Sequence, residues 1–433
     1  MNVADRRLIQ RFNSAEIRET TLPSGLKVVT DPMDTVETVS LGVWVEAGTR
    51  YEPAAINGVS HLLEHMAFKG TERRTAQGIA EEMDAVGGHL NAYTARDHTA
   101  YYAKILKEDS GLALDVIADI LQNSTLDPEE LAREQAVVVQ EINQAVDTPD
   151  DIIFDHFQAT AYPDQPVGRA VLGTEDLVRA MTRDTVRGYM REHYSAPRMV
   201  LSASGRIDHD ALVEAAKDAF SLLPPPTPAI TEAARYAGGD YREDRDLEQV
   251  HVVLGFDGVA YDDPDYYTAS VLSTLLGGGM SSRLFQEVRE KRGLVYSIYS
   301  FASSYNDGGL FGVYAGTGED EVAELIPVMC DEIVKVGGGI AESEVQRARA
   351  QLKASILMSL ESTTSRCEQL ARQVVVYGRP IPVAEVVAKV EAITADDCAR
   401  VARRLFAGAP TFTAIGPLGK VEAFEKIAER LKP

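Results

Sequence analysis

Three consecutive prolines at 224–226, near the middle of the chain, constrain its folding more than any other feature. Proline lacks a backbone N–H and its ring fixes φ, so a run of three enters neither a helix interior nor a central strand. The tract therefore predicts a stiff, exposed connector between two folded parts. Of the 433 residues 45% are hydrophobic, which is enough for each part to bury its own core. We expect domains at 1–222 and 241–433, joined by a linker at 223–240.

The two parts share a pattern of elements that indicates an internal duplication. A strand-like run at 39–47 precedes a helical segment, and a similar run at 249–256 precedes another at 266–276. Met-Thr-Arg-Asp at 181–184 and Ile-Thr-Ala-Asp at 393–396 each precede a helix and a strand. The period of roughly 200 residues is that of a domain. We therefore predict two similar α+β halves, each a mainly antiparallel sheet covered by helices.

The first half carries the box His61-Leu62-Leu63-Glu64-His65 in a segment with helical periodicity. On a helix, His61 and His65 lie one turn apart on one face, a spacing at which two imidazoles share a metal ion. Glu64 projects near the same face, where it could take a proton from a metal-bound water. The alternative interpretation is a solvated helix face that carries three polar residues.

A hydrolytic zinc site usually has three protein ligands and one open position, so the box needs a third ligand from elsewhere. The segment that starts at Asp127, with Pro128 at the first helical position, reads as a long helix and contains Glu134 and Glu141. These glutamates share one helix face, but about 10 Å of helix axis separates them. One would be the ligand and the other would orient a ligand or face the substrate. Spacing alone does not distinguish them.

The box and the paired glutamates resemble the pitrilysin/insulinase family of zinc peptidases, whose H-x-x-E-H box inverts the H-E-x-x-H order. The segment Thr-Leu-Pro-Ser-Gly-Leu-Lys-Val at 21–28 and the duplicated half are similar to the mitochondrial-processing-peptidase branch and its bacterial relatives. In this family the third ligand is a glutamate about 76 residues beyond the second histidine, which implies Glu141. A further glutamate seven residues earlier is typical of the family, and here it is Glu134.

The resemblance implies a zinc-dependent endopeptidase that hydrolyses extended peptides or presequence-like segments. One zinc ion per chain would be held by His61, His65 and Glu141, with Glu64 as the general base. Glu134 would orient a ligand or steer substrate. The two halves are expected to close around a central chamber. The alternative is a non-catalytic core subunit related to the processing peptidases, but such relatives typically have eroded boxes and this box is intact.

The resemblance also implies where substrate would bind. The run at 88–94 alternates like a strand, and in this family it is an edge strand that an extended peptide joins, here through Asn91 and Ala92. In the second half, Arg289 and Tyr296 match a family pair that reaches the zinc half and grips the substrate. Because one sequence holds both parts, we expect a homodimer. A heterodimer with an inactive homologue is the alternative.

Composition excludes several other classes of protein. The net charge of −23 would repel a phosphate backbone, so nucleic acid is not an expected partner, whereas basic peptides are. The sequence contains no run of 18 apolar residues, so a membrane span is not expected. Residues 1–20 lack the apolar core of a secretory signal. The three cysteines are too few and too scattered for a disulfide framework. We therefore expect a cytoplasmic protein.

Overall fold

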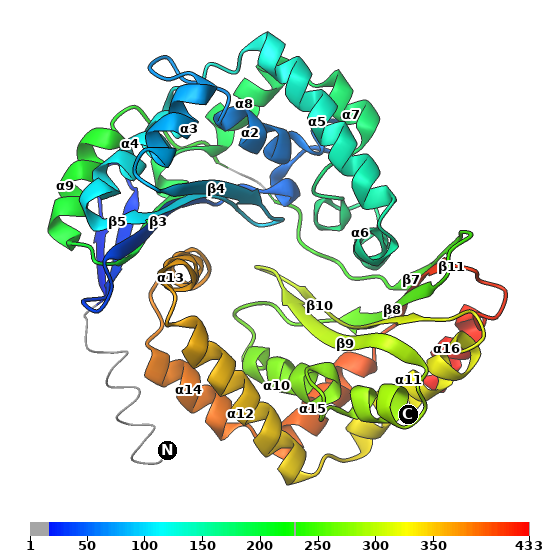
Figure 1. Cartoon of the computed structure of the whole chain (residues 1–433). Coiled ribbons are helices and arrows are strands. Elements are labelled where there is room, and N and C mark those ends of the chain that lie inside the picture. Colours follow the sequence, from blue (N-terminus) through cyan, green and yellow to red (C-terminus); the bar gives the residue numbers. More distant parts are fainter. Residues whose placement is uncertain (1–16, 229–230, 433) are drawn as a thin grey trace. The chain divides into compact units, whose positions relative to one another are not determined.

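The computed structural model describes residues 17–228 and 231–432, which divide into two compact units (Figure 1). The first unit comprises Met1–Asn143, Arg169–Glu232 and Leu357–Val383. The second unit comprises Gln144–Gly168, Ala233–Ile356 and Ala384–Pro433. The units therefore alternate along the chain, whereas the sequence predicted two consecutive domains.

The first unit is built on a sheet with the strand order β1-β2-β6-β3-β5-β4. Its strands are β1 (Arg18–Thr21), β2 (Lys27–Pro32), β3 (Thr38–Val45), β4 (His89–Thr94), β5 (Thr99–Leu106) and β6 (Met199–Gly205). β2 and β6 run parallel, and the other neighbours run antiparallel.

The second unit repeats this sheet with the order β7-β11-β8-β10-β9. Its strands are β7 (Gly239–Asp244), β8 (Val250–Asp257), β9 (Val295–Ser304), β10 (Gly309–Thr317) and β11 (Thr411–Gly416). β7 and β11 are parallel and the other neighbours are antiparallel, so this order matches β2-β6-β3-β5-β4 strand for strand. The predicted α+β class with two similar halves is confirmed.

Helices cover both sheets. In the first unit they are α2 (Val59–Ala67), α3 (Ala76–Asp84), α4 (Ser110–Gln122), α5 (Pro128–Val146, which ends in the second unit), α7 (Glu175–Ala180), α8 (Arg183–His193), α9 (His209–Ala219) and α13 (Thr363–Tyr377). In the second unit they are α6 (Pro149–Ala161), α10 (Tyr266–Gly277), α11 (Val322–Gly338), α12 (Glu342–Ser359, which ends in the first unit), α14 (Val383–Ala392), α15 (Ala395–Phe406) and α16 (Phe424–Arg430). Within the described residues, no helix has both the length and the apolar character needed to cross a bilayer.

Strand β3 shows how the first sheet comes to be buried on both faces. Side chains alternate along a strand, so Leu41 and Val43 enter the core that contains α4. Trp44 points to the other face and packs in the cluster that contains α13, while the Ser40 Oγ lies 2.9 Å from the Thr363 Oγ1 of that helix. The sheet is therefore covered on one face by local helices and on the other by a helix from much later in the chain.

Helix α13 is held on the first sheet by apolar contacts and by a buried ion pair. Leu370 and Val374 pack against strand residues that include Val29. The Arg366 guanidinium lies 2.9 Å from the Asp31 carboxylate, and both side chains are less than one-tenth exposed. Such a pair offsets part of the cost of burying each charge, and loss of either partner would leave the other buried and unpaired.

Helix α6 makes the reciprocal contact in the second unit. It comes from the first half of the sequence, yet its residues Ile153 and Phe157 pack with Val253 and Ile415 of the second sheet. Each sheet is thus covered by a helix that the predicted boundaries of 1–222 and 241–433 assigned to the other domain. The physical reason is that both helices are amphipathic, and local periodicity does not say which apolar face a helix covers.

Candidate metal centre

Helix α2 positions the box by burying the opposite side of the helix. Val59, Leu62, Leu63 and Met66 are fully buried, in agreement with the predicted apolar stripe. The histidines and the glutamate of the box are only partly buried, so they lie on the accessible face of the same helix. The core contacts therefore determine the direction in which the polar side chains point.

A buried carboxylate anchors the first turn of α2. The Glu52 oxygens accept hydrogen bonds from the backbone N–H groups of Gly58 and Ser60, each at 2.7 Å, and from the Asn57 side chain at 2.8 Å. Gly58 has a φ of 95°, and a Cβ there would lie 2.8 Å from the Leu172 oxygen, so glycine is required. Since helix N-terminal N–H groups lack internal partners, Glu52 fixes the start of the helix.

Three donor atoms converge where α2 meets α5. The Glu141 Oε2 lies 3.6 Å from the Nε2 of His61 and 3.5 Å from the Nε2 of His65. One ligand atom from each of these residues lies within 4.8 Å of the others, and in the described part of the chain no other cluster of this kind is found. The sequence-predicted ligands are thus brought together, all within the first unit.

The donor set fits a zinc ion. Two imidazole nitrogens and one carboxylate oxygen are the ligands of a hydrolytic zinc site, and tetrahedral bonds of about 2.1 Å place neighbouring ligand atoms about 3.4 Å apart. The observed separations of 3.5 and 3.6 Å are close to this spacing. Burial and the neighbouring His65 lower the pKa of His61 to about 4, so at pH 7 His61 has the neutral imidazole that a metal requires.

Glu134 lies behind His65. Its Oε2 is 3.0 Å from the His65 Nδ1, and its side chain is 7% exposed, compared with 38% for Glu141. The two glutamates approach opposite nitrogens of one imidazole ring, which is how residues two helical turns apart on α5 both contact it. His61 differs, because within the described residues its Nδ1 has no hydrogen-bond partner.

Glu64 is oriented by a residue of strand β4. The Thr94 hydroxyl donates a hydrogen bond of 2.6 Å to the Glu64 Oε2. Burial raises the pKa of Glu64 above its ordinary value, and the Thr94 hydrogen bond opposes this shift. A carboxylate with a raised pKa, held beside the convergent donors, is suited to accept and return a proton.

Asn91 and Ala92 lie on β4, the terminal strand in the order of the first sheet. The Asn91 Oδ1 accepts a hydrogen bond from the Ala92 N–H at 2.8 Å, so a side chain covers this backbone donor. The predicted edge strand is present, and it runs beside the box helix, as the Thr94 contact shows.

Arg289 and Tyr296 are neighbours in the second unit. The Arg289 guanidinium carbon lies 5.3 Å from the centre of the Tyr296 ring and 4.8 Å from that of Phe285, which are cation–π distances. Tyr296 is 81% exposed at the start of β9, the terminal strand of the second sheet and the counterpart of β4. The pair therefore presents a charged and an aromatic group together at this sheet edge.

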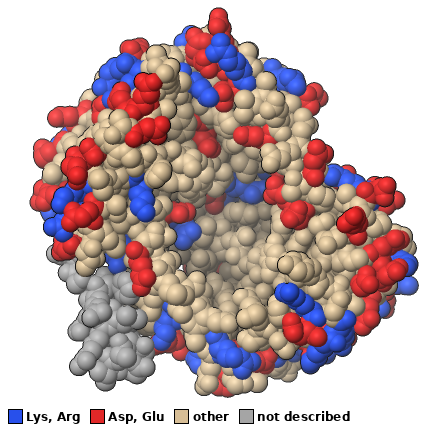
Figure 2. Space-filling view, viewed as in Figure 1, with Lys and Arg blue, Asp and Glu red and all other residues tan. Residues whose placement is uncertain are grey.

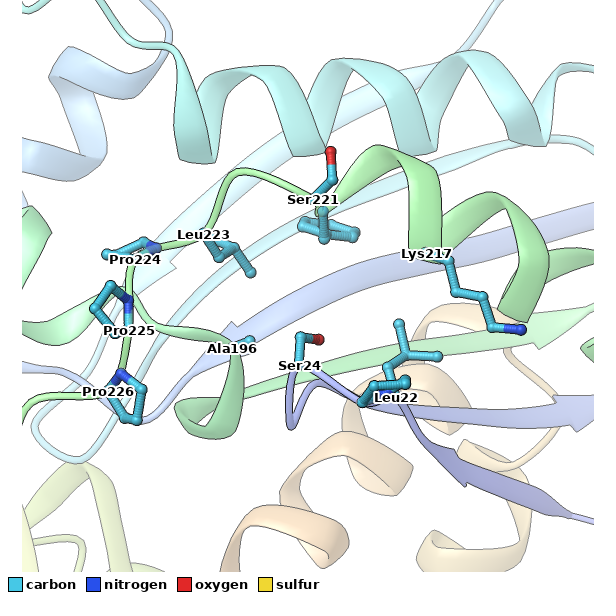
Figure 3. A pocket seen from close by; sticks show the side chains of 11 residues that line it. Leu22, Ser24, Ala196, Lys217, Ser221, Leu223, Pro224, Pro225 and Pro226 are labelled. Atoms are coloured by element: carbon cyan, nitrogen blue, oxygen red, sulfur yellow. The ribbon is translucent and has the colours of Figure 1, made fainter.

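The first unit also contains a pocket of about 620 Å³, separate from the metal centre (Figure 3). It lies between the β1–β2 turn, the end of α9 and the proline tract, and its polar groups include Ser24 and Lys217. Lys217 is paired with Glu214 at 2.5 Å. The residues that line this pocket include none of the metal-centre residues His61, Glu64, His65, Glu134 and Glu141.

Sequence reasoning missed three residues that hold the centre: Glu52, Lys69 and Thr94. Lys69, whose Nζ lies 2.7 Å from the Glu134 Oε1, follows His65 by four residues, a spacing that could have drawn attention to it. Thr94 lies in the predicted edge strand, but its contact with Glu64 depends on how the strand packs against the helix. Glu52 precedes the helix and has no periodic signal, and its partners are backbone N–H groups together with the side chains of Asn57 and Ser60.

The fold is a duplicated α+β unit in which α2 carries the H-x-x-E-H box and faces the glutamates of α5. These features together define the class of inverted-motif zinc peptidases. Residues 27–175 match the model for "Insulinase (Peptidase family M16)", and residues 180–352 match the model for "Peptidase M16 inactive domain". The chain belongs to peptidase family M16, in the branch that is similar to mitochondrial-processing peptidases.

Similar proteins and structures support this assignment. An "uncharacterized zinc protease" of Streptomyces coelicolor is 40% identical over 417 residues, which cover 94% of this chain and 91% of that protein. A "probable mitochondrial-processing peptidase subunit beta" of Arabidopsis thaliana is 38% identical and covers 97% of this chain and 82% of its own length. The crystal structure of a protease from Helicobacter pylori has a TM-score of 0.86 at 23% identity, over 93% of this chain and all of that one, and it shows the fold.

Proposed function

We propose that this chain is a zinc-dependent endopeptidase that hydrolyses extended peptides, including presequence-like segments. The observation that carries the proposal is the convergence of His61, His65 and Glu141 beside the oriented carboxylate of Glu64. The names of the relatives, which include zinc proteases, support a peptidase that uses zinc. We propose one zinc ion per chain, held by the three convergent residues.

In this proposal a bound zinc ion would lower the pKa of a coordinated water to about 7 and polarise the scissile carbonyl. Glu64 takes the proton of the attacking water and delivers it to the leaving amine, and Thr94 holds its carboxylate in position. Glu134 keeps the His65 ring oriented through its Nδ1.

We propose that substrate joins β4 as an added strand along Asn91 and Ala92. The terminal position of β4 and its contact with the box helix support this mode of binding. Backbone pairing of this kind depends little on side chains, so it suits a range of extended peptides. We also propose Arg289 and Tyr296 as substrate-binding residues, supported by the exposure of Tyr296 and by its stacking with the Arg289 cation.

The net charge of −23 supports a preference for basic peptides. On the face shown in Figure 2 acidic and basic side chains are interspersed, so on this face the preference would come from local carboxylates. Three free, buried cysteines support a reducing compartment such as the cytoplasm.

Because zinc ligands and the Arg289–Tyr296 pair occur in one chain, we propose a homodimer. A heterodimer with an inactive homologue is the other assembly to test.

Chelation tests the proposed activity. Purified protein should contain about one zinc ion per chain, cleave a mixed peptide library, lose cleavage after dialysis against a chelator, and regain it when zinc is returned. Products identified by mass spectrometry would give the cleavage preference, and light scattering of the same sample gives the assembly. A stable protein that binds no zinc and cleaves nothing would instead favour the non-catalytic core subunit.

The Thr94→Val variant should lower kcat roughly 10–150-fold, because a hydrogen bond to a charged group contributes roughly 1.5–3 kcal/mol. Zinc affinity should not change, since Thr94 contacts Glu64 and not a ligand. Thr94→Ser keeps the hydroxyl and is the matched control, with kcat close to wild type. Equal kcat values for the valine and serine variants would show that the hydrogen bond does not orient the base.

A further inference from the structure

Lys69 lies at the C-terminal end of the box helix and contacts the metal centre indirectly. Its backbone N–H donates to the Met66 oxygen at 3.2 Å, which closes the last turn of α2. Its side chain, 30% exposed, extends to α5, where its Nζ lies 2.7 Å from the Glu134 Oε1. Lys69 lies two residues beyond the end of α2 at Ala67 and four residues after His65, and both side chains reach Glu134.

The two oxygens of the Glu134 carboxylate have different partners. Oε1 pairs with the Lys69 ammonium, and Oε2 lies 3.0 Å from the His65 Nδ1. A planar carboxylate that is held at both oxygens has little rotational freedom, so its acceptor is fixed relative to the imidazole. The side chain is 7% exposed, and water therefore has little access to replace either contact.

A positive charge is required at this place for physical reasons. Burying a carboxylate is costly unless a cation or several donors accompany it. Glu141 approaches both histidines, and Glu64 interacts electrostatically with His65 and Glu141, so Glu134 adds a third carboxylate to this region. The ammonium offsets part of this charge from the side of Glu134 that faces away from the convergent donors.

We propose that Lys69 is a positioning residue for the metal centre. By holding Glu134, it keeps the Nδ1–H of His65 engaged, so that the Nε2 lone pair remains available to the proposed zinc ion beside Glu141, whose Oε2 is 3.5 Å from this nitrogen. Partners of this indirect kind typically change metal affinity 10–100-fold. The inference rests on the proposed zinc site and adds a residue that acts through another side chain, without touching metal or substrate.

Zinc affinity of the metal-free protein, measured by competition with a chromophoric chelator, tests the proposal. Lys69→Met should weaken zinc binding about tenfold or more and should speed zinc release by a similar factor. Lys69→Arg should stay within a few-fold of wild type, because a guanidinium can also hold a carboxylate. Lys107→Met is the matched control, since Lys107 pairs with the exposed Glu37 at 2.6 Å in the same unit, and its affinity should equal that of wild type.

A double variant separates positioning from a merely structural ion pair. Because Lys69 acts through Glu134, Lys69→Met combined with Glu134→Gln should bind zinc no more weakly than Glu134→Gln alone. A further tenfold loss in the double variant would overturn the proposal. So would a Lys69→Met protein that melts at a lower temperature without metal yet keeps wild-type zinc affinity. Lys69→Gln repeats the comparison if the methionine variant does not fold.

The readout also separates this inference from the proposed function. Zinc affinity can be measured whether or not peptides are cleaved. A wild-type chain that binds zinc and cleaves no peptide would refute the endopeptidase and leave the Lys69 comparison intact. A wild-type chain that binds no zinc would overturn both proposals. If the wild type cleaves peptides and Lys69→Met keeps wild-type zinc affinity, only the proposed role of Lys69 would be overturned.

Discussion

The Glu64→Gln variant is expected to keep its zinc and to hydrolyse peptides about 10²–10⁴-fold more slowly than the wild type. Glutamine has nearly the same shape as glutamate but cannot accept a proton, so the substitution removes the base and little else. Glu64 is not among the convergent donors, and its carboxylate accepts a hydrogen bond from Thr94. This variant should therefore lose turnover while its zinc content stays at the wild-type level.

Zinc content by atomic spectrometry and kcat on one reporter peptide check this expectation. Glu129→Gln is the matched control, because Glu129 is an exposed glutamate at the start of α5 and its loss should alter neither quantity. Turnover by Glu64→Gln within tenfold of wild type would refute the assignment of the general base. Loss of zinc from this variant would instead mean that Glu64 belongs to the ligand set.

The Glu141→Gln variant is expected to lose zinc affinity by more than about 100-fold, which exceeds the usual effect of residues behind a ligand. The carboxamide oxygen is neutral, so the ion loses the anionic member of its ligand set. Glu141 is 38% exposed, and the fold should therefore tolerate the change. Metal-free Glu141→Gln should melt close to metal-free wild type.

The zinc affinity of Glu141→Gln is to be compared with that of Glu134→Gln. Glu134 contacts the far nitrogen of His65, so its substitution should lower zinc affinity 10–100-fold and leave measurable binding. Equilibrium dialysis against buffered zinc measures both variants. Full zinc occupancy in Glu141→Gln, or a larger loss in Glu134→Gln, would show that the ligand is assigned to the wrong glutamate.

Much of the fold could be predicted because it depends on local pattern and on repetition. The apolar stripe of α2 gave the buried side of that helix, and Asp127 followed by Pro128 marked the start of α5, where the Asp127 carboxylate accepts the Glu129 N–H at 2.8 Å. Recurrence of similar segments predicted two like halves, and the matching strand orders confirm them.

The exchange of α6 and α13 could not be predicted in this way. Both helices have an apolar face, and either sheet offers an apolar surface to cover it. The choice is made by long-range partners such as the Arg366–Asp31 pair, whose members are more than 300 residues apart. Domain boundaries drawn at a composition break describe the chain but not the compact units.

The sequence by itself determined which residue types are available for chemistry and that only one half carries the box. It also determined that His61 and His65 share one face, because they are one helical turn apart. Only the tertiary structure decided how Glu134 and Glu141 divide their roles, since this depends on which nitrogen of the His65 ring each one approaches. It also supplied the contacts of Thr94 and Lys69. The physical reason is that a helical period orients side chains relative to their own helix, whereas hydrogen bonds between elements depend on packing that no local pattern encodes.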